Sequence, residues 1–199
     1  GALTMPLHAY EAYYARRGEL WERQMLIKAR VSAGSLDLGN RFLRMIGPFV
    51  FPGHIDGRPV EEIRRIKDRI EGKIGKKGES GSHLKLRSGG IRDVEFVVQC
   101  LQLIVGQVHK QVRSGHTLEA IGQLRRVGAL SDGQAASLRE AYLFFRRVEH
   151  RLQMMHGLSD YTLPEDEGAQ LTMARSLGIS TTDEYKRVLE EHLSAVQST

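Results

Sequence analysis

The strongest constraint on the fold comes from residues 91–106, in which apolar residues recur every three or four positions. This spacing places them on one face of an α-helix. Phe96, Cys100 and Leu103 extend the apolar surface further around the helix. A helix with so wide an apolar surface must be covered by others, so we expect it inside a bundle.

Helical spacing, helix-start residues and terminal glycines recur along the rest of the chain, whereas strand patterns are nearly absent. We predict an all-α helical bundle. In the longest predicted helix, a stripe is expected to face inward: Leu138, Tyr142, Phe145, Leu152 and Met155. This longest helix is predicted over residues 131–156, and further helices are predicted over 6–16, 18–30, 35–46, 59–74, 117–127, 164–178 and from 182 onward. Ser35 or Asp37 is expected to cap the helix over 35–46, Ser131 to cap the longest helix, and Gly128 to end the helix over 117–127.

Two stretches interrupt the helical pattern. Glycine and proline at positions 47, 48, 52, 53 and 57 are expected to end the third helix at Ile46 and to form a linker. Residues 75–90 are rich in Gly, Ser and Lys and are expected to form a loop that leads into the next helix.

The composition of the chain limits the classes of protein to which it can belong. No apolar run approaches the roughly 18 residues needed to span a membrane, so no membrane partner is expected. The single cysteine, Cys100, lies in an apolar helix and is typical of a core residue in a reducing compartment, which predicts a cytoplasmic protein. Residues 58–92 hold 11 Lys or Arg against 5 Asp or Glu, so this stretch accounts for the net charge of +5.

Neither a catalytic residue nor a metal site is predicted from the residues. Asp93 and Glu95 are two positions apart, so on a helix they point about 200° apart and cannot share one ion. His109 and His116 flank a predicted loop and have no third ligand near them in the sequence.

An anion site is a candidate at the start of the long apolar helix. Two glycines precede it, and the free N–H groups and positive dipole of a helix start favour phosphate or nucleotide. The residues proposed for this contact are Lys85, Arg87, Gly89, Gly90 and Arg92. The alternative interpretation is a plain tight turn.

Two polar stripes are also candidates for function. One stripe lies on the apolar helix and consists of Arg92, Glu95, Gln99 and Gln102 at helical spacing. The other lies on the longest helix and consists of Arg146, Glu149, His150 and Gln153. Because unpaired polar groups in a core are costly, the stripes should contact each other or face a groove. We predict a polar network or groove formed by Glu95, Gln99, Arg146, Glu149 and His150.

Several segments together resemble one family, the bifunctional glutamine synthetase adenylyltransferase and adenylyl-removing enzymes. The resemblance covers nearly the whole chain in order. It is carried by residues 1–30 and 59–71 and by the segments LKLRSGGIRDVEFVVQCLQLIVG (84–106), TLEAIGQLRRVGAL (117–130), AYLFFRRVEHRLQMM (141–155) and YTLPED (161–166).

The resemblance implies a place within a larger enzyme. Residues 1–34 would be trailing helices of a nucleotidyltransferase module, residues 35–57 a connector and residues 58–199 a helical bundle. The pattern is most similar to the region behind the N-terminal module, which removes AMP by phosphorolysis. The family implies Mg²⁺, ATP and phosphate as ligands, and glutamine synthetase and the PII signal protein as partners. No catalytic aspartate of the family can be carried over to a residue of this chain, so the isolated chain is expected to be inactive.

One alternative is a pure scaffold that binds no ligand, and another is a helical nucleic-acid-binding domain. The basic stretch and the two helices around Gly128 favour it. Acidic residues near the start of the second helix and along it, Asp132 and Glu140 among them, speak against base recognition. We therefore expect no nucleic-acid partner.

Overall fold

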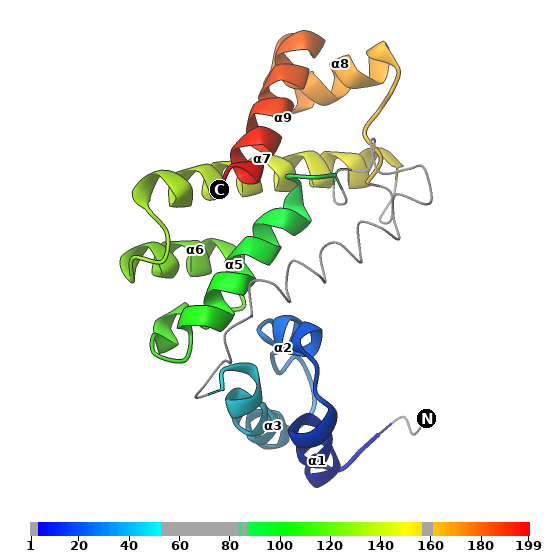
Figure 1. Cartoon of the computed structure of the whole chain (residues 1–199). Helices are drawn as coiled ribbons and strands as arrows, with labels where there is room; N and C mark the ends of the chain where they lie inside the picture. Colours follow the sequence, from blue (N-terminus) through cyan, green and yellow to red (C-terminus); the bar gives the residue numbers. More distant parts are fainter. Residues whose placement is uncertain (1–3, 53–83, 85–86, 157–160) are drawn as a thin grey trace. The chain divides into compact units, whose positions relative to one another are not determined.

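The computed structural model describes residues 4–52, 84, 87–156 and 161–199 (Figure 1). Within these ranges it contains eight α-helices, one 3-10 helix and no β-strand, which confirms the all-α prediction. The chain divides into two compact units, Gly1–Ile66 with Val98–Ala129 and Lys67–Val97 with Leu130–Thr199. The division falls inside one continuous helix, α5 (Ile91–Val105). The predicted helix over 59–74 and most of the predicted loop over 75–90 lie outside the described residues.

Three helices begin the first unit: α1 (Leu7–Arg17), α2 (Leu20–Leu26) and α3 (Leu36–Val50). Local sequence signals set their starts. Pro6 directly precedes α1, and the hydroxyl of Ser35 accepts a 3.3 Å hydrogen bond from the Leu38 amide at the start of α3, as expected. Both α1 and α2 pack on α3 (Figure 1). The buried cluster of this unit consists of Ile27, Ile46, Val50 and Leu103.

The expected break at Gly47 and Pro48 is wrong, because α3 continues through both residues to Val50. Proline removes one helical hydrogen bond, but packing beyond it stabilises the extra turn. Val50 is buried, and the Phe49 ring stacks on Tyr14 at 4.7 Å between centroids. The second helix is shorter than expected: it ends at Leu26, and a tight turn follows in which the Ala29 amide donates to the Leu26 carbonyl at 3.0 Å.

The rest of the first unit is built around the end of α5. After it come the 3-10 helix η1 (Lys110–Val112) and α6 (Thr117–Arg126). Gln102 is buried on α5 and donates to the carbonyls of Val112 at 2.5 Å and Ser114 at 2.8 Å, which holds this connection in place. Gly128 follows α6 with a φ of 76°, consistent with the predicted glycine stop.

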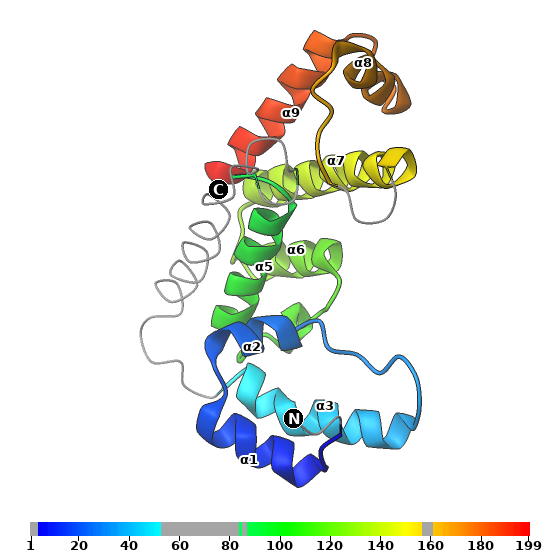
Figure 2. The same ribbon diagram turned by 90° about the vertical axis from the view of Figure 1, so that its right-hand side faces the viewer.

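The second unit contains α7 (Asp132–His156), α8 (Glu167–Ser176) and α9 (Thr182–Gln197). Helix α9 crosses and packs on α7, and both views of the chain show this (Figures 1 and 2). Ser131 caps α7 as predicted, with its hydroxyl accepting from the Gln134 amide at 3.2 Å. The inward stripe of α7 is confirmed for Leu138, Tyr142, Phe145 and Leu152. Met155 is 39% exposed, so its expected burial is wrong.

Candidate functional site

The paired glycines before α5 form a turn pressed against α9. Gly89 has a φ of 79°, and a Cβ built on it would lie 2.3 Å from the Leu193 carbonyl oxygen. A Cβ on Gly90 would lie 2.4 Å from the carbonyl oxygen of Leu84. Both positions therefore require glycine for close backbone packing, which is a structural reason for the motif.

The side chain of Asp93 already occupies the N-terminal end of α5. The buried carboxylate of Asp93 accepts a 2.7 Å hydrogen bond from the Gly89 amide, and the Gly90 amide donates to the Arg87 carbonyl at 2.9 Å. A negative group thus lies where a phosphate was expected. Sequence reasoning considered Asp93 only as a metal ligand, although an acidic residue in the first helical turn is a common capping signal.

One cation of the predicted anion site, Arg87, has a partner on another helix. The Arg87 guanidinium bonds to the Glu190 carboxylate of α9 at 2.5 Å. Arg92 is half-buried on α5, and Lys85 lies outside the described residues. Phosphate binding by Lys85, Arg87, Gly89, Gly90 and Arg92 together stays a prediction.

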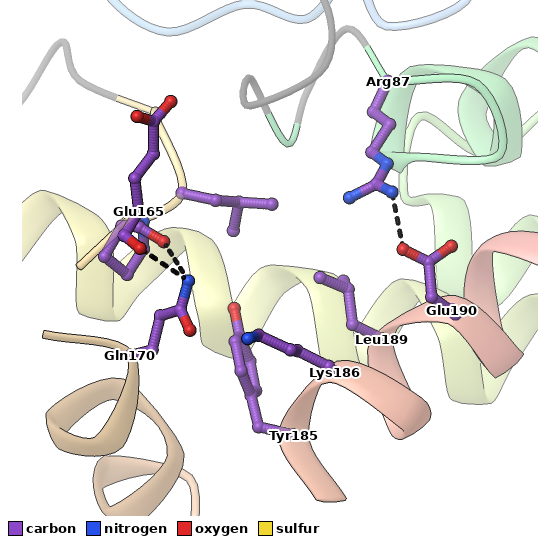
Figure 3. A pocket seen from close by; sticks show the side chains of 9 residues that line it. Arg87, Glu165, Gln170, Tyr185, Lys186, Leu189 and Glu190 are labelled. Carbon is purple, nitrogen blue, oxygen red and sulfur yellow. Dashed lines mark hydrogen bonds and ion pairs between the residues drawn. The ribbon is translucent and has the colours of Figure 1, made fainter. Parts of the chain in front are cut away.

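Arg87 instead lines a pocket of about 370 Å³ (Figure 3). One wall comes from α9, with Tyr185, Lys186 and Leu189. The facing wall includes Leu163 from the segment before α8 and Gln170 from α8 itself. The Gln170 amide donates to the carbonyls of Pro164 at 3.0 Å and Glu165 at 3.1 Å, which fixes this wall. Sequence reasoning missed this pocket because Arg87 is 103 positions from Glu190 and far along the chain from the other lining residues.

Tyr185 is the most buried polar side chain of the pocket. It is 3% exposed, and its hydroxyl has no hydrogen-bond partner among the described residues. Burial raises the pKa of Tyr185 to about 12, and the Arg87 cation opposes that rise. The hydroxyl is therefore protonated at neutral pH and can act as a donor.

The predicted polar network lies elsewhere in the same unit and is centred on Arg146. Its guanidinium lies 3.5 Å from the Glu95 carboxylate and forms an ion pair with Glu149. The guanidinium also donates to the Tyr142 hydroxyl at 3.0 and 3.1 Å. Burial alone would lower the pKa of Arg146, but the hydrogen bonds with Glu149 and Tyr142 raise it above its ordinary value.

The structure brings together three of the five residues predicted for this network, Glu95, Arg146 and Glu149. His150 is exposed on α7, and Gln99 is buried in the other unit. The expected contact between the two polar stripes is thus confirmed for Glu95. Glu95 and Glu149 both pair with Arg146, so the cluster forms the predicted network at these three residues.

Among the residues that the structure describes, no three His, Cys, Asp or Glu side chains come together to hold a metal ion. None of the described helices is both long enough and apolar enough to cross a membrane.

Comparison with known families identifies the chain. Residues 64–199 match the family model described as GlnD PII-uridylyltransferase. The chain belongs to this family. Residues 1–45 match a second model, described as glutamate-ammonia ligase adenylyltransferase. The division into residues 1–34, 35–57 and 58–199 stays a prediction.

Curated relatives carry one shared name along nearly all of the chain, bifunctional glutamine synthetase adenylyltransferase/adenylyl-removing enzyme. The relative from Cutibacterium acnes is 40% identical over 94% of this chain, and that from Rhizobium meliloti is 39% identical over 98%. The relative from Hahella chejuensis is 35% identical over 98%. These matches cover only 19%, 20% and 21% of the relatives' own lengths, so the chain spans about a fifth of each.

Proposed function

We propose that this chain is part of an enzyme that adds AMP to glutamine synthetase and removes it again, and so controls nitrogen assimilation. The similarity over nearly the whole chain to relatives of that name carries the proposal. The family model over residues 64–199 is named for uridylyl transfer, which is also nucleotidyl transfer. The match of residues 1–45 to an adenylyltransferase model favours AMP as the transferred group.

Within that enzyme, we assign the chain to the deadenylylating half, where AMP is removed by phosphorolysis. The support is the glycine-glycine-isoleucine-arginine motif at 89–92 followed by Asp93 and Glu95. The chain supplies a helical body that positions substrate and transmits control. Mg²⁺ is then bound by catalytic carboxylates elsewhere in the enzyme, and ATP and phosphate are ligands of the same parent enzyme.

The proposed partners follow from the same family. Glutamine synthetase is the substrate protein, and the PII signal protein brings the nitrogen signal. We propose a cytoplasmic location and no nucleic-acid or membrane partner. Labelled duplex DNA at low salt checks the rival function: salt-sensitive binding would favour the nucleic-acid alternative.

A chimera tests the proposed function. The region of the Rhizobium meliloti relative that aligns over 198 residues is replaced by this chain. We expect the chimera to adenylylate glutamine synthetase and to release ADP from the adenylylated form with phosphate. Loss of both activities in a folded chimera would contradict the proposal.

The same chimera distinguishes the two halves. Leu138→Arg disrupts a fully buried position of α7 and should abolish phosphorolytic release of ADP while adenylylation persists. The opposite pattern would assign the chain to the adenylylating half. As a baseline, the isolated 199-residue chain should release no ADP from adenylylated glutamine synthetase with Mg²⁺ and phosphate.

A further inference from the structure

We propose that the pocket beside α9 binds an oxyanion, the carboxylate or phosphate group of a small molecule, through Tyr185, Lys186 and Arg87. This inference does not depend on the activity proposed for the parent enzyme. It rests on an unpartnered buried hydroxyl, on two cations that line the same cavity and on the placement of the neighbouring carboxylates.

The hydroxyl of Tyr185 lacks an acceptor. The side chain is almost fully buried, and its hydroxyl is directed toward the pocket beside Gln170 and Lys186 (Figure 3). Among the described residues nothing accepts its proton in a hydrogen bond. A buried hydroxyl without a partner is costly, whereas a ligand oxygen in the pocket can accept its hydrogen bond.

Two cations line the same cavity. Lys186 is exposed, and no ion pair or hydrogen bond of its ammonium group occurs within the described ranges. One guanidinium nitrogen of Arg87 donates to Glu190, and further N–H groups of the guanidinium lie on the pocket side (Figure 3). A positively charged donor and a neutral hydroxyl donor together suit an anionic oxygen.

The carboxylates of the pocket do not cancel the positive charge at its centre. Arg87 and Glu190 neutralise each other, so Lys186 supplies the positive charge at the centre, and the Glu165 carboxylate points away from Tyr185 and Lys186 (Figure 3). The volume of about 370 Å³ is at the small end of ligand sites, and Leu163 and Leu189 offer apolar contact. A small carboxylate or phosphate therefore fits better than a nucleic acid or another large polyanion.

Amide NMR titration of the ¹⁵N-labelled 199-residue chain tests the site. Inorganic phosphate is the first probe and succinate the second, both at constant ionic strength set with chloride. We expect saturable shifts at the pocket amides with a dissociation constant on the order of 1 mM for the probe that fits. Tighter binding of phosphate or of succinate then distinguishes the two sources of the oxyanion.

Three variants test whether Tyr185 and Lys186 bind the probes. Tyr185→Phe and Lys186→Gln should each raise the dissociation constant about tenfold. Arg187→Gln is the matched control and should leave it unchanged, because Arg187 bonds to Glu191 at 2.6 Å on the same helix and does not line the pocket. Circular dichroism confirms folding, and the exposed Lys186 variant decides alone if Tyr185→Phe does not fold. Absence of saturable shifts with both probes, or equal binding by all variants, would overturn the proposal.

Discussion

Two buried tyrosines in the same unit lie in opposite polar surroundings. Tyr142 on α7 is 8% exposed, and its hydroxyl contacts Arg146 at 3.0 Å and Glu95 at 3.4 Å. Tyr185 on α9 is 3% exposed, and its hydroxyl has no partner in the described part of the chain. Around Tyr142 the polar groups satisfy one another, so they contribute to the fold. The Tyr185 hydroxyl, in contrast, is a donor without an acceptor. A donor of this kind is expected in a binding pocket and not in a structural network, where polar groups satisfy one another.

A substitution in the glycine turn beside the pocket should have the largest effect on the free energy of unfolding. Gly89→Ala places a Cβ against the Leu193 carbonyl at a positive φ, and we expect it to lower the free energy of unfolding by about 3 kcal/mol. Gly128→Ala is the control, because Gly128 has a similar φ of 76° with open space around it, and should cost about 1 kcal/mol. Urea denaturation measures both. Equal losses would mean that the contact with α9 does not hold the turn, and so would weaken the view of a preformed pocket wall.

Removing the cation of the Arg146 network should have the second-largest effect on the free energy of unfolding. Arg146→Met leaves Glu149, which is 3% exposed, without its cation. We expect a loss of about 2 kcal/mol, less than for a fully buried pair because Arg146 is partly exposed to solvent. Arg147→Met, at an exposed position of the same helix, is the control and should cost under about 0.5 kcal/mol. If both variants unfold at the same denaturant concentration, Glu149 does not depend on Arg146.

Local signals made much of this fold predictable. Ser35 and Ser131 cap their helices as expected, and the spacing of Glu95 and Arg146 predicted that their stripes would meet. These features depend on residues within a few positions of one another, or on one face of a helix. The family resemblance further identified the enzyme class of the relatives.

The misses share a physical cause, which is packing between distant segments. Pro48 stays helical because Val50 and Phe49 pack on other helices, and no local rule encodes that contact. Arg87 turns from the expected phosphate site to Glu190, 103 positions away. The pocket around Tyr185 likewise joins three segments that the sequence does not place together.

Removing the Tyr142 hydroxyl should have a moderate effect. Tyr142→Phe keeps the ring but deletes a group that accepts two hydrogen bonds from Arg146. We expect a loss of about 1 kcal/mol in the free energy of unfolding, because the deleted group leaves charged donors less well satisfied. The unfolding midpoint and slope in urea give this value. An unchanged midpoint would show that the network does not need the hydroxyl.

Tyr185→Phe should change the free energy of unfolding least, and the change should have the opposite sign. This change deletes a hydroxyl that is buried and unpartnered, so nothing in the described fold loses a hydrogen bond. We expect stability in ligand-free buffer to stay the same or to rise by up to about 1 kcal/mol. The pair of Tyr→Phe variants, measured side by side in urea, therefore separates a structural hydroxyl from one kept for a ligand. A loss at Tyr185 as large as at Tyr142 would mean that its hydroxyl already has a partner in the folded chain, and the pocket would then lose its donor.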